Sequence, residues 1–169
     1  MGILDNQTIN KMKKSFLFFL IILNQSMAQW EFKINKEENE INAIGVVKFS
    51  ISNPDTIVLN LSKSRRLGID FSIEGIHFKA SEKYYVLFEI SDRKIKVLSS
   101  ISKKGKIRIL KLKDLIRREE YEIQDFLKIL KRGSECILTI NSGSQVIQGI
   151  NKLSGSTKAI NSVLTGNYP

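Results

Sequence analysis

The sequence is poor in the residues that build metal sites and disulfides. It has one cysteine, one histidine and two prolines in 169 residues. A single cysteine excludes a disulfide within the chain, so the stability of the fold must come from packing. Because His77 is the only histidine, one chain cannot supply two histidine ligands or a His₂–carboxylate triad. We therefore predict no metal site and no cofactor.

Motifs for catalysis are also missing. The chain has no Gly-x-Ser-x-Gly elbow, P-loop, dinucleotide-binding fingerprint or EF-hand loop. A Ser-His-Asp or Cys-His arrangement would have to use His77, which alternates with Ile76 and Phe78 and is expected to face solvent. Cys136 lies in an apolar strand pattern and is expected to be a small buried side chain. We predict no catalytic residue, although paired carboxylates leave no mark in a sequence.

Residues 1–28 have the pattern of an export signal. From Met12 the chain reads two lysines, the apolar run Phe16–Leu23 and a polar end that finishes at Ala28. We predict cleavage between Ala28 and Gln29, with Met12 as the start; the alternative is a longer basic region that begins at residue 1. The apolar run is far shorter than the roughly 20 residues of a spanning helix. We therefore expect an exported protein, periplasmic or extracellular, with no transmembrane span after cleavage.

Residues 29–169 are predicted to form a single β-rich globular domain. Only two prolines occur, and no segment is of low complexity, so no linker is indicated. Apolar residues alternate with polar ones along the first half, as in half-buried strands. The clearest alternating sets are Trp30/Phe32/Ile34, Val47/Phe49/Ile51, Ile57/Leu59/Leu61, Leu67/Ile69/Phe71/Ile73, Tyr84/Val86/Phe88/Ile90, Ile95/Val97 and Ile107/Ile109. The phase changes at Gly75, which suggests a bulge or tight turn there.

The pattern becomes helical late in the chain. Apolar residues from Ile123 to Leu130 recur at one helical face, and Gly133 is a suitable residue to end that helix. Two strands follow, over 135–140 and 145–152, and a second helix is expected over 156–164. About nine short strands with two C-terminal helices favour an antiparallel β-sandwich or an open barrel.

The segment Leu153-Ser154-Gly155 through Ile160, preceded by a helix, Gly133 and two strands, resembles the C-terminal signature of small exported bacterial β-sandwich proteins. The family that it resembles is the periplasmic accessory protein found with type VI secretion systems. Asn151 stands where that family has phenylalanine. The resemblance implies an exported β-sandwich fold and carries no catalytic residue.

The strongest local signal is positive charge. The whole chain carries a net charge of +10, and nine basic residues and no acid lie between Arg93 and Lys113. Within a hairpin around Lys103-Lys104-Gly105, alternation places the basic side chains on the outward face. One interpretation is a solvated face whose lysines protect a strand edge. The other is an anion-binding surface made of Lys94, Lys96, Lys103, Lys104, Lys106 and Arg108.

Two classes of function fit these observations. The first is a non-enzymatic exported β-sandwich module that binds a protein partner or an anionic envelope component, such as a polymer or a lipid. No aromatic residue interrupts the basic stretch, so base stacking lacks a platform and sequence-specific binding of nucleic acid is not expected. The second is a carboxylate-dependent hydrolase acting on polysaccharide or peptide, which would need two close acids in a concave pocket.

Overall fold

The computed structural model describes residues 29–49, 56–76, 78–80, 82–143 and 145–166. The export signal predicted for residues 1–28 and the histidine at position 77 lie outside the described residues. Both of these predictions are therefore untested. None of the helices in the described part of the chain is both long and apolar enough to cross a bilayer.

Strands make up most of the described chain, and every pairing between them is antiparallel. Two helices, α2 (Ile123–Arg132) and α3 (Ser156–Thr165), come late in the chain, as predicted. The strands are β1 (Trp30–Asn35), β2 (Glu40–Phe49), β3 (Ile57–Ser64), β4 (Gly68–Glu74), β5 (Tyr85–Ile90), β6 (Arg93–Lys103), β7 (Lys106–Asp114), β8 (Glu120–Tyr121), β9 (Glu135–Asn141) and β10 (Val146–Lys152).

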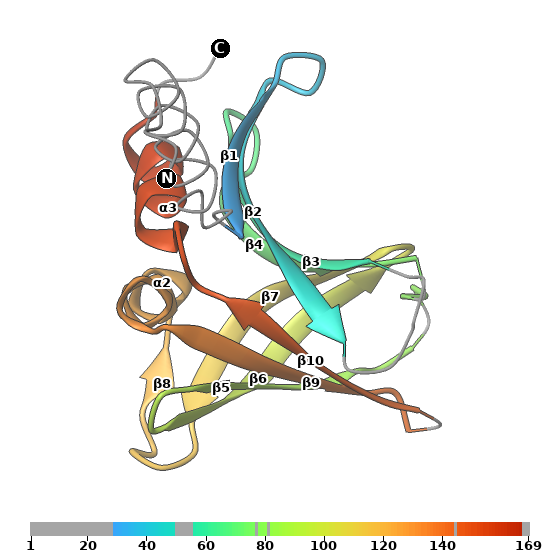
Figure 1. The fold of residues 1–169 in the computed structure, drawn as a ribbon. Helices are drawn as coiled ribbons and strands as arrows, with labels where there is room; N and C mark the ends of the chain where they lie inside the picture. Colours follow the sequence, from blue (N-terminus) through green and yellow to red (C-terminus); the bar gives the residue numbers. More distant parts are fainter. Residues whose placement is uncertain (1–28, 50–55, 77, 81, 144, 167–169) are drawn as a thin grey trace, which may run out of the picture.

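Eight of these strands close into a barrel (Figure 1). The sheet runs in the order β2-β10-β9-β5-β6-β7-β4-β3, and β3 pairs again with β2. Strand β1 pairs with β2 beside β10, and the short β8 pairs with β7. The prediction of a mainly β antiparallel fold with two late helices is confirmed for the described residues. The sheet closes on itself, however, and so forms neither the sandwich nor the open barrel that the sequence pattern favours, because β2 pairs with both β3 and β10.

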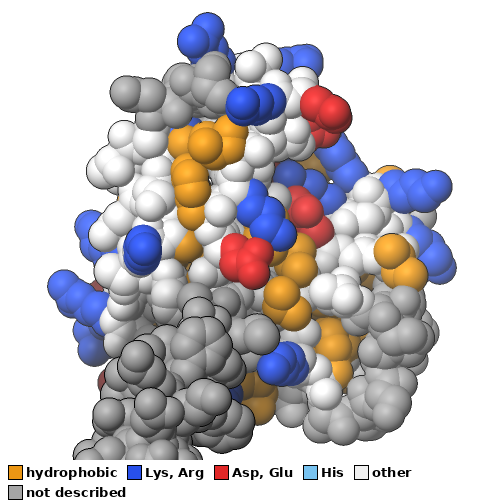
Figure 2. Space-filling view, turned by 45° about the horizontal axis from the view of Figure 1, so that its top comes forward, with side chains coloured by type: hydrophobic (Ala, Val, Ile, Leu, Met, Phe, Trp, Pro, Cys, Tyr) orange, Lys and Arg blue, Asp and Glu red, His pale blue; other side chains and the backbone are white. Residues whose placement is uncertain are grey.

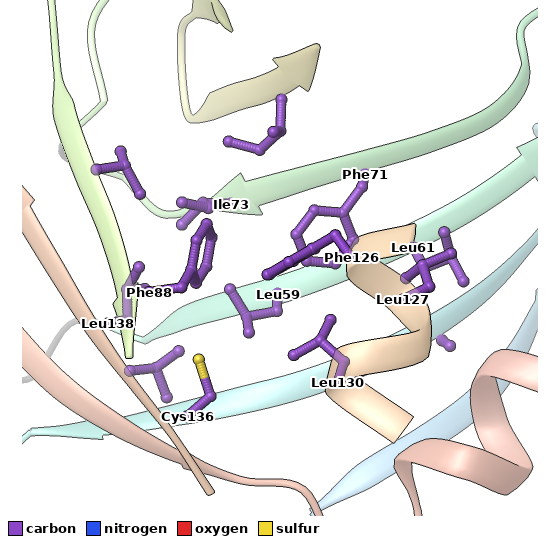
Figure 3. Close-up of a cluster of buried hydrophobic side chains, with 14 of the residues drawn as sticks. Leu59, Leu61, Phe71, Ile73, Phe88, Phe126, Leu127, Leu130, Cys136 and Leu138 are labelled. Carbon is purple, nitrogen blue, oxygen red and sulfur yellow. The ribbon is translucent and has the colours of Figure 1, made fainter. Parts of the chain in front are cut away.

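Alternating apolar side chains fill the interior of the barrel (Figure 3). Phe71 of β4 and Phe88 of β5 are fully buried, and Phe126 of α2 inserts between them, with ring centroids 5.4 and 4.9 Å away. Leu127 and Leu130 of α2 are also fully buried. The apolar stripe that predicted this helix is thus the stripe that closes one end of the barrel.

The other end of the barrel is closed by a short segment after β4. Phe78 is 1% exposed and its ring lies edge-on to Tyr84, with centroids 5.3 Å apart. Gly105 of the β6–β7 turn donates its N–H to the Phe78 carbonyl at 2.8 Å, and Gly75 donates to the Gly105 carbonyl at 2.9 Å. The phase change at Gly75 therefore marks a turn that ends β4. With both ends closed by aromatic side chains, the interior is a packed core.

The first strand is joined to the last by a buried polar contact. Trp30, 2% exposed, donates its indole N–H to the Asn151 side chain at 2.7 Å. The Asn151 amide in turn donates to the Val46 carbonyl at 2.7 Å. A Cβ on Gly45 would lie within 2.3 Å of the Trp30 ring, so only glycine fits there. Asn151, the position where the chain departs from the resembling family, thus connects β1, β2 and β10.

Candidate anion-binding surface

The basic hairpin has the predicted position and the predicted turn. Strands β6 and β7 pair from Ile95↔Asp114 at the base to Lys103↔Lys106 at the tip. Gly105 in the turn has φ +74°, a conformation that glycine adopts without strain. Near the base lie Lys94 and Lys96, whereas Lys103, Lys104, Lys106 and Arg108 lie at or near the tip. The six predicted residues therefore form two separate groups.

Two members of the tip group are neutralised by acids on a neighbouring strand. Arg108 Nε contacts one Asp70 oxygen at 2.6 Å, and Lys106 Nζ lies 3.4 Å from the other. Lys106 also lies 3.2 Å from Glu74, the residue directly opposite it on β4. Asp70 is only 5% exposed. These contacts make Lys106 and Arg108 part of an internal polar cluster, which leaves their charge less available to an external anion.

The same cluster bears on the hydrolase hypothesis. Asp70 and Glu74 are near neighbours on β4, as paired catalytic acids would be. Both oxygens of Asp70 contact a cation, and Glu74 Oε1 also accepts hydrogen bonds from Asn60 at 3.0 Å and Ser72 at 3.1 Å. A general acid must instead present a protonated carboxyl to the substrate. The contacts of these two carboxylates are those of a structural network of ion pairs and hydrogen bonds.

At the base of the hairpin, one predicted lysine is paired and another is not. Lys94 lies 3.1 Å from Glu89 on β5. Lys96 lies over the Tyr85 ring, 4.9 Å from its centroid, where a cation is attracted but keeps its charge. Directly opposite Lys96 on β7 is Lys113. Lys113 belongs to the basic run but not to the predicted site, because a break in the alternation of β7 hides that it faces the same way as Lys96.

Four lysines of the hairpin have no acid within ion-pair distance among the described residues: Lys96, Lys103, Lys104 and Lys113. Three of them belong to the predicted site. Two charged groups on one strand pair would normally be kept apart, since like charges placed directly opposite each other destabilise a sheet. The opposed pair Lys96 and Lys113 is not required by the fold, although Glu120 of β8 lies directly opposite Lys113 on its other side.

Between the two lysine groups, the hairpin exposes apolar side chains. The strand register slips after Val97 and recovers by Ser100, so that Leu98 on β6 and Leu110 on β7 have no cross-strand partner. These two β-bulges leave Leu98 42% and Leu110 37% exposed, and Ile101 beside them is 42% exposed. We call the set Leu98, Ile101, Leu110, Lys96, Lys103, Lys104 and Lys113 the hairpin face.

Outside the hairpin face, charges of both signs are mixed. Figure 2 shows acidic and basic side chains next to one another near the middle of the visible surface. At the hairpin base, Arg93 lies 3.6 Å from the fully buried Asp114 and donates to the Tyr121 hydroxyl at 2.7 Å. Burial is the main cause that raises the pKa of Tyr121. This group fastens β8 to the barrel and has a structural role.

The described residues contain neither an accessible thiol nor a group of metal ligands. Cys136 is fully buried, and desolvation raises the pKa of its thiol far above the usual range, so the predicted inert side chain is confirmed. Within the described residues, no three histidine, cysteine or carboxylate side chains are grouped as metal ligands. Comparisons with protein-family models, curated proteins and solved structures find no match to this chain. The resemblance to the type VI accessory family therefore stays a prediction.

Proposed function

We propose that this protein is a non-enzymatic binding module that attaches to an anionic lipid surface of the cell envelope through the hairpin face. The observation that carries the proposal is that exposed Leu98 and Leu110 lie beside lysines that form no ion pair with the described part of the chain. The predicted export signal supports an envelope location, which is a separate expectation.

The apolar side chains and the lysines of the hairpin face both suit the surface of a bilayer. Apolar side chains that enter the headgroup region gain from leaving water, at about 25 cal/mol per Å² of buried apolar surface. Lysines next to them are attracted to anionic lipids, which is worth about 1 kcal/mol for each lysine near the surface. Four lysines and three apolar side chains together suffice for reversible attachment. An acidic polysaccharide would use the lysines and leave the leucines exposed to water, which is why a lipid is the better occupant.

The test is co-sedimentation of the purified protein with vesicles. Vesicles of phosphatidylcholine alone are compared with vesicles that contain phosphatidylglycerol. We expect binding to the anionic vesicles only, with an affinity that decreases as salt rises. The double variant Lys96→Glu/Lys113→Glu should weaken binding at least about tenfold. The double variant Leu98→Ser/Leu110→Ser should also weaken it.

A control variant replaces a lysine on another part of the surface. Lys158→Glu on α3 changes the charge by the same amount per site, away from the hairpin, and should bind as the parent protein does. Equal binding to neutral vesicles would contradict the proposal. So would binding to heparin without binding to anionic vesicles, since that result assigns the face to a polysaccharide. Far-UV circular dichroism of each variant checks that the barrel is intact.

A further inference from the structure

A second surface combines an apolar pocket with unpaired cations, and β5 separates it from the hairpin face. It lies where β2 and β10 meet, and the described residues of these strands form the pairs Gly149↔Phe49 and Ile150↔Lys48. A Cβ on Gly149 would lie 2.8 Å from the Phe49 ring and 2.6 Å from Val47. The absence of a side chain at Gly149 thus leaves room for the side chains of Val47 and Phe49.

The pocket beside this junction has a volume of about 330 Å³. Its apolar walls are Phe49 from β2, Ile137 from β9 and Ile150 from β10. Ile137 and Ile150 are direct cross-strand partners, and Ile150 is 43% exposed. Ligand pockets usually measure about 300–1,000 Å³, so this one suits a small molecule.

Two lysines stand at the edge of the pocket. Lys48 is directly opposite Ile150 across the sheet, and Lys152 is two residues further along β10, on the same outward face. Both are exposed, and among the described residues neither has an acid within ion-pair distance. Glu135 is the cross-strand partner of Lys152 but makes no ion pair with it. Two positive charges thus flank a small apolar surface.

We infer that this pocket binds a small amphiphilic anion, namely an aliphatic carboxylate. The hydrocarbon chain lies against Phe49, Ile137 and Ile150, where it loses contact with water. The carboxylate lies between the ammonium groups of Lys48 and Lys152, where it gains electrostatic attraction and hydrogen bonds from charged donors. A cationic amphiphile would be repelled by both lysines, and a carboxylate without a chain would leave the apolar walls uncovered. This site is independent of the hairpin face.

The test uses three soluble probes in isothermal titration calorimetry. Octanoate has both the chain and the anion, octyltrimethylammonium has the chain with the opposite charge, and acetate has the anion without the chain. We expect octanoate to bind saturably at one site, octyltrimethylammonium at least about tenfold more weakly, and acetate not at all. A negative heat-capacity change for octanoate would report burial of its chain.

Variants separate this pocket from other surfaces. Lys48→Glu/Lys152→Glu should abolish the preference for octanoate over the cationic probe, and Ile150→Gln should weaken octanoate at least about threefold. The matched control Val146→Gln changes another exposed apolar residue of the same strand, 64% exposed and outside the pocket, and should leave octanoate binding unchanged. The hairpin variants should also leave it unchanged. Equal affinity for the anionic and cationic probes, or octanoate binding that survives both pocket variants, would overturn the inference.

Discussion

The indole N–H of Trp30 and the side-chain oxygen of Asn151 are hydrogen-bonded at 2.7 Å although 121 residues separate them in the chain. The bond is buried, and it joins the first described strand to the last. It lies beside the junction where β2 pairs with β10. A single side chain, Asn151, thus satisfies both the Trp30 N–H and the Val46 carbonyl at this junction.

Replacing Asn151 by leucine should destabilise the protein strongly. The variant Asn151→Leu leaves the buried Trp30 N–H and the part-buried Val46 carbonyl without their side-chain partner, and an unsatisfied buried group costs about 1–3 kcal/mol. We expect the free energy of unfolding in urea to fall by about 2–4 kcal/mol. Asn161→Leu on α3, where the asparagine is exposed and its side chain accepts from Lys131, should change it by less than about 0.5 kcal/mol. Similar stabilities of the two variants would show that the seam does not depend on this bond.

A side chain at position 45 should displace the only tryptophan. In Gly45→Ala the new Cβ would lie within 2.3 Å of the Trp30 ring, and overpacking of this kind costs about 1–3 kcal/mol. The fluorescence maximum of Trp30 should shift to longer wavelength as the ring is pushed toward water. Gly68→Asn is a useful control, since Gly68 has φ +67° and no atom within 4 Å of a new Cβ, and asparagine tolerates that conformation. An unchanged emission spectrum in Gly45→Ala would refute the steric argument.

The sequence predicted local structure better than the closure of the sheet. Period-two alternation located most strands, and the stripe from Ile123 to Leu130 located α2, because burial of one face imposes those patterns. The closed barrel depends on pairing between β2 and β10, which are far apart in sequence, and no local pattern reports such pairing. Trp30 was expected in a strand, but its partner Asn151 was noted only as a departure from a resembling family.

The sequence predicts the position of the basic hairpin correctly, but it overestimates how much of the positive charge is free of acidic partners. The basic run from Arg93 to Lys113 does form a hairpin, but Lys106 and Arg108 meet Asp70 and Glu74 from a strand more than thirty residues earlier. The small polar side chains at outward positions of β3 and β4, such as Asn60 and Ser72, could have indicated these ion pairs. Outward strand positions that face open water more often carry long charged side chains, whereas these are buried beneath the ion pairs.

Removing the Asp70 charge should make the hairpin tip more attractive to anions. In Asp70→Asn the side chain keeps its size, but Arg108 and Lys106 lose a full negative partner. At low salt we expect about threefold to tenfold tighter binding to anionic vesicles, in line with about 1 kcal/mol for one charge near the surface. The gain should disappear at high salt. Asp125→Asn removes the same charge from α2, where the aspartate pairs with Lys128, and is expected to leave vesicle binding unaltered.

Glu40 should make stability depend on pH in the acidic range. Burial, followed by the nearby Glu38 charge, raises the pKa of Glu40 in the folded state, with Lys106 opposing the shift. The folded protein therefore holds this proton more tightly than the unfolded chain, and stability decreases as pH rises from the ordinary glutamate pKa through the raised one. Glu40→Gln removes that loss, so its stability relative to the parent should increase between pH 4 and pH 7. Urea titrations at both pH values measure the difference, and Glu37→Gln in the β1–β2 turn is the matched control. If the difference in stability between Glu40→Gln and the parent stayed constant between pH 4 and pH 7, this role of Glu40 would be contradicted.

Cys136 should be unreactive until the protein unfolds. Its side chain is fully buried in β9, and burial raises the thiol pKa, so both access and thiolate formation are suppressed. Ellman's reagent should label no thiol in native protein and one thiol per chain in urea. A disulfide between two chains through Cys136 should likewise be absent unless the barrel has opened. Rapid labelling of the native protein would contradict the buried position.

The two bulges of the β6–β7 hairpin cancel each other. The pairs Ile95↔Asp114 below them and Ile101↔Arg108 above them belong to one and the same register, because each strand carries one additional residue. Deleting Leu98 and Leu110 together would therefore restore an uninterrupted ladder, with every other side chain of the hairpin on its present face and the turn at Gly105 unchanged. We therefore expect a chain shortened by these two leucines to keep its barrel and to lose two of the three exposed apolar side chains of the hairpin face.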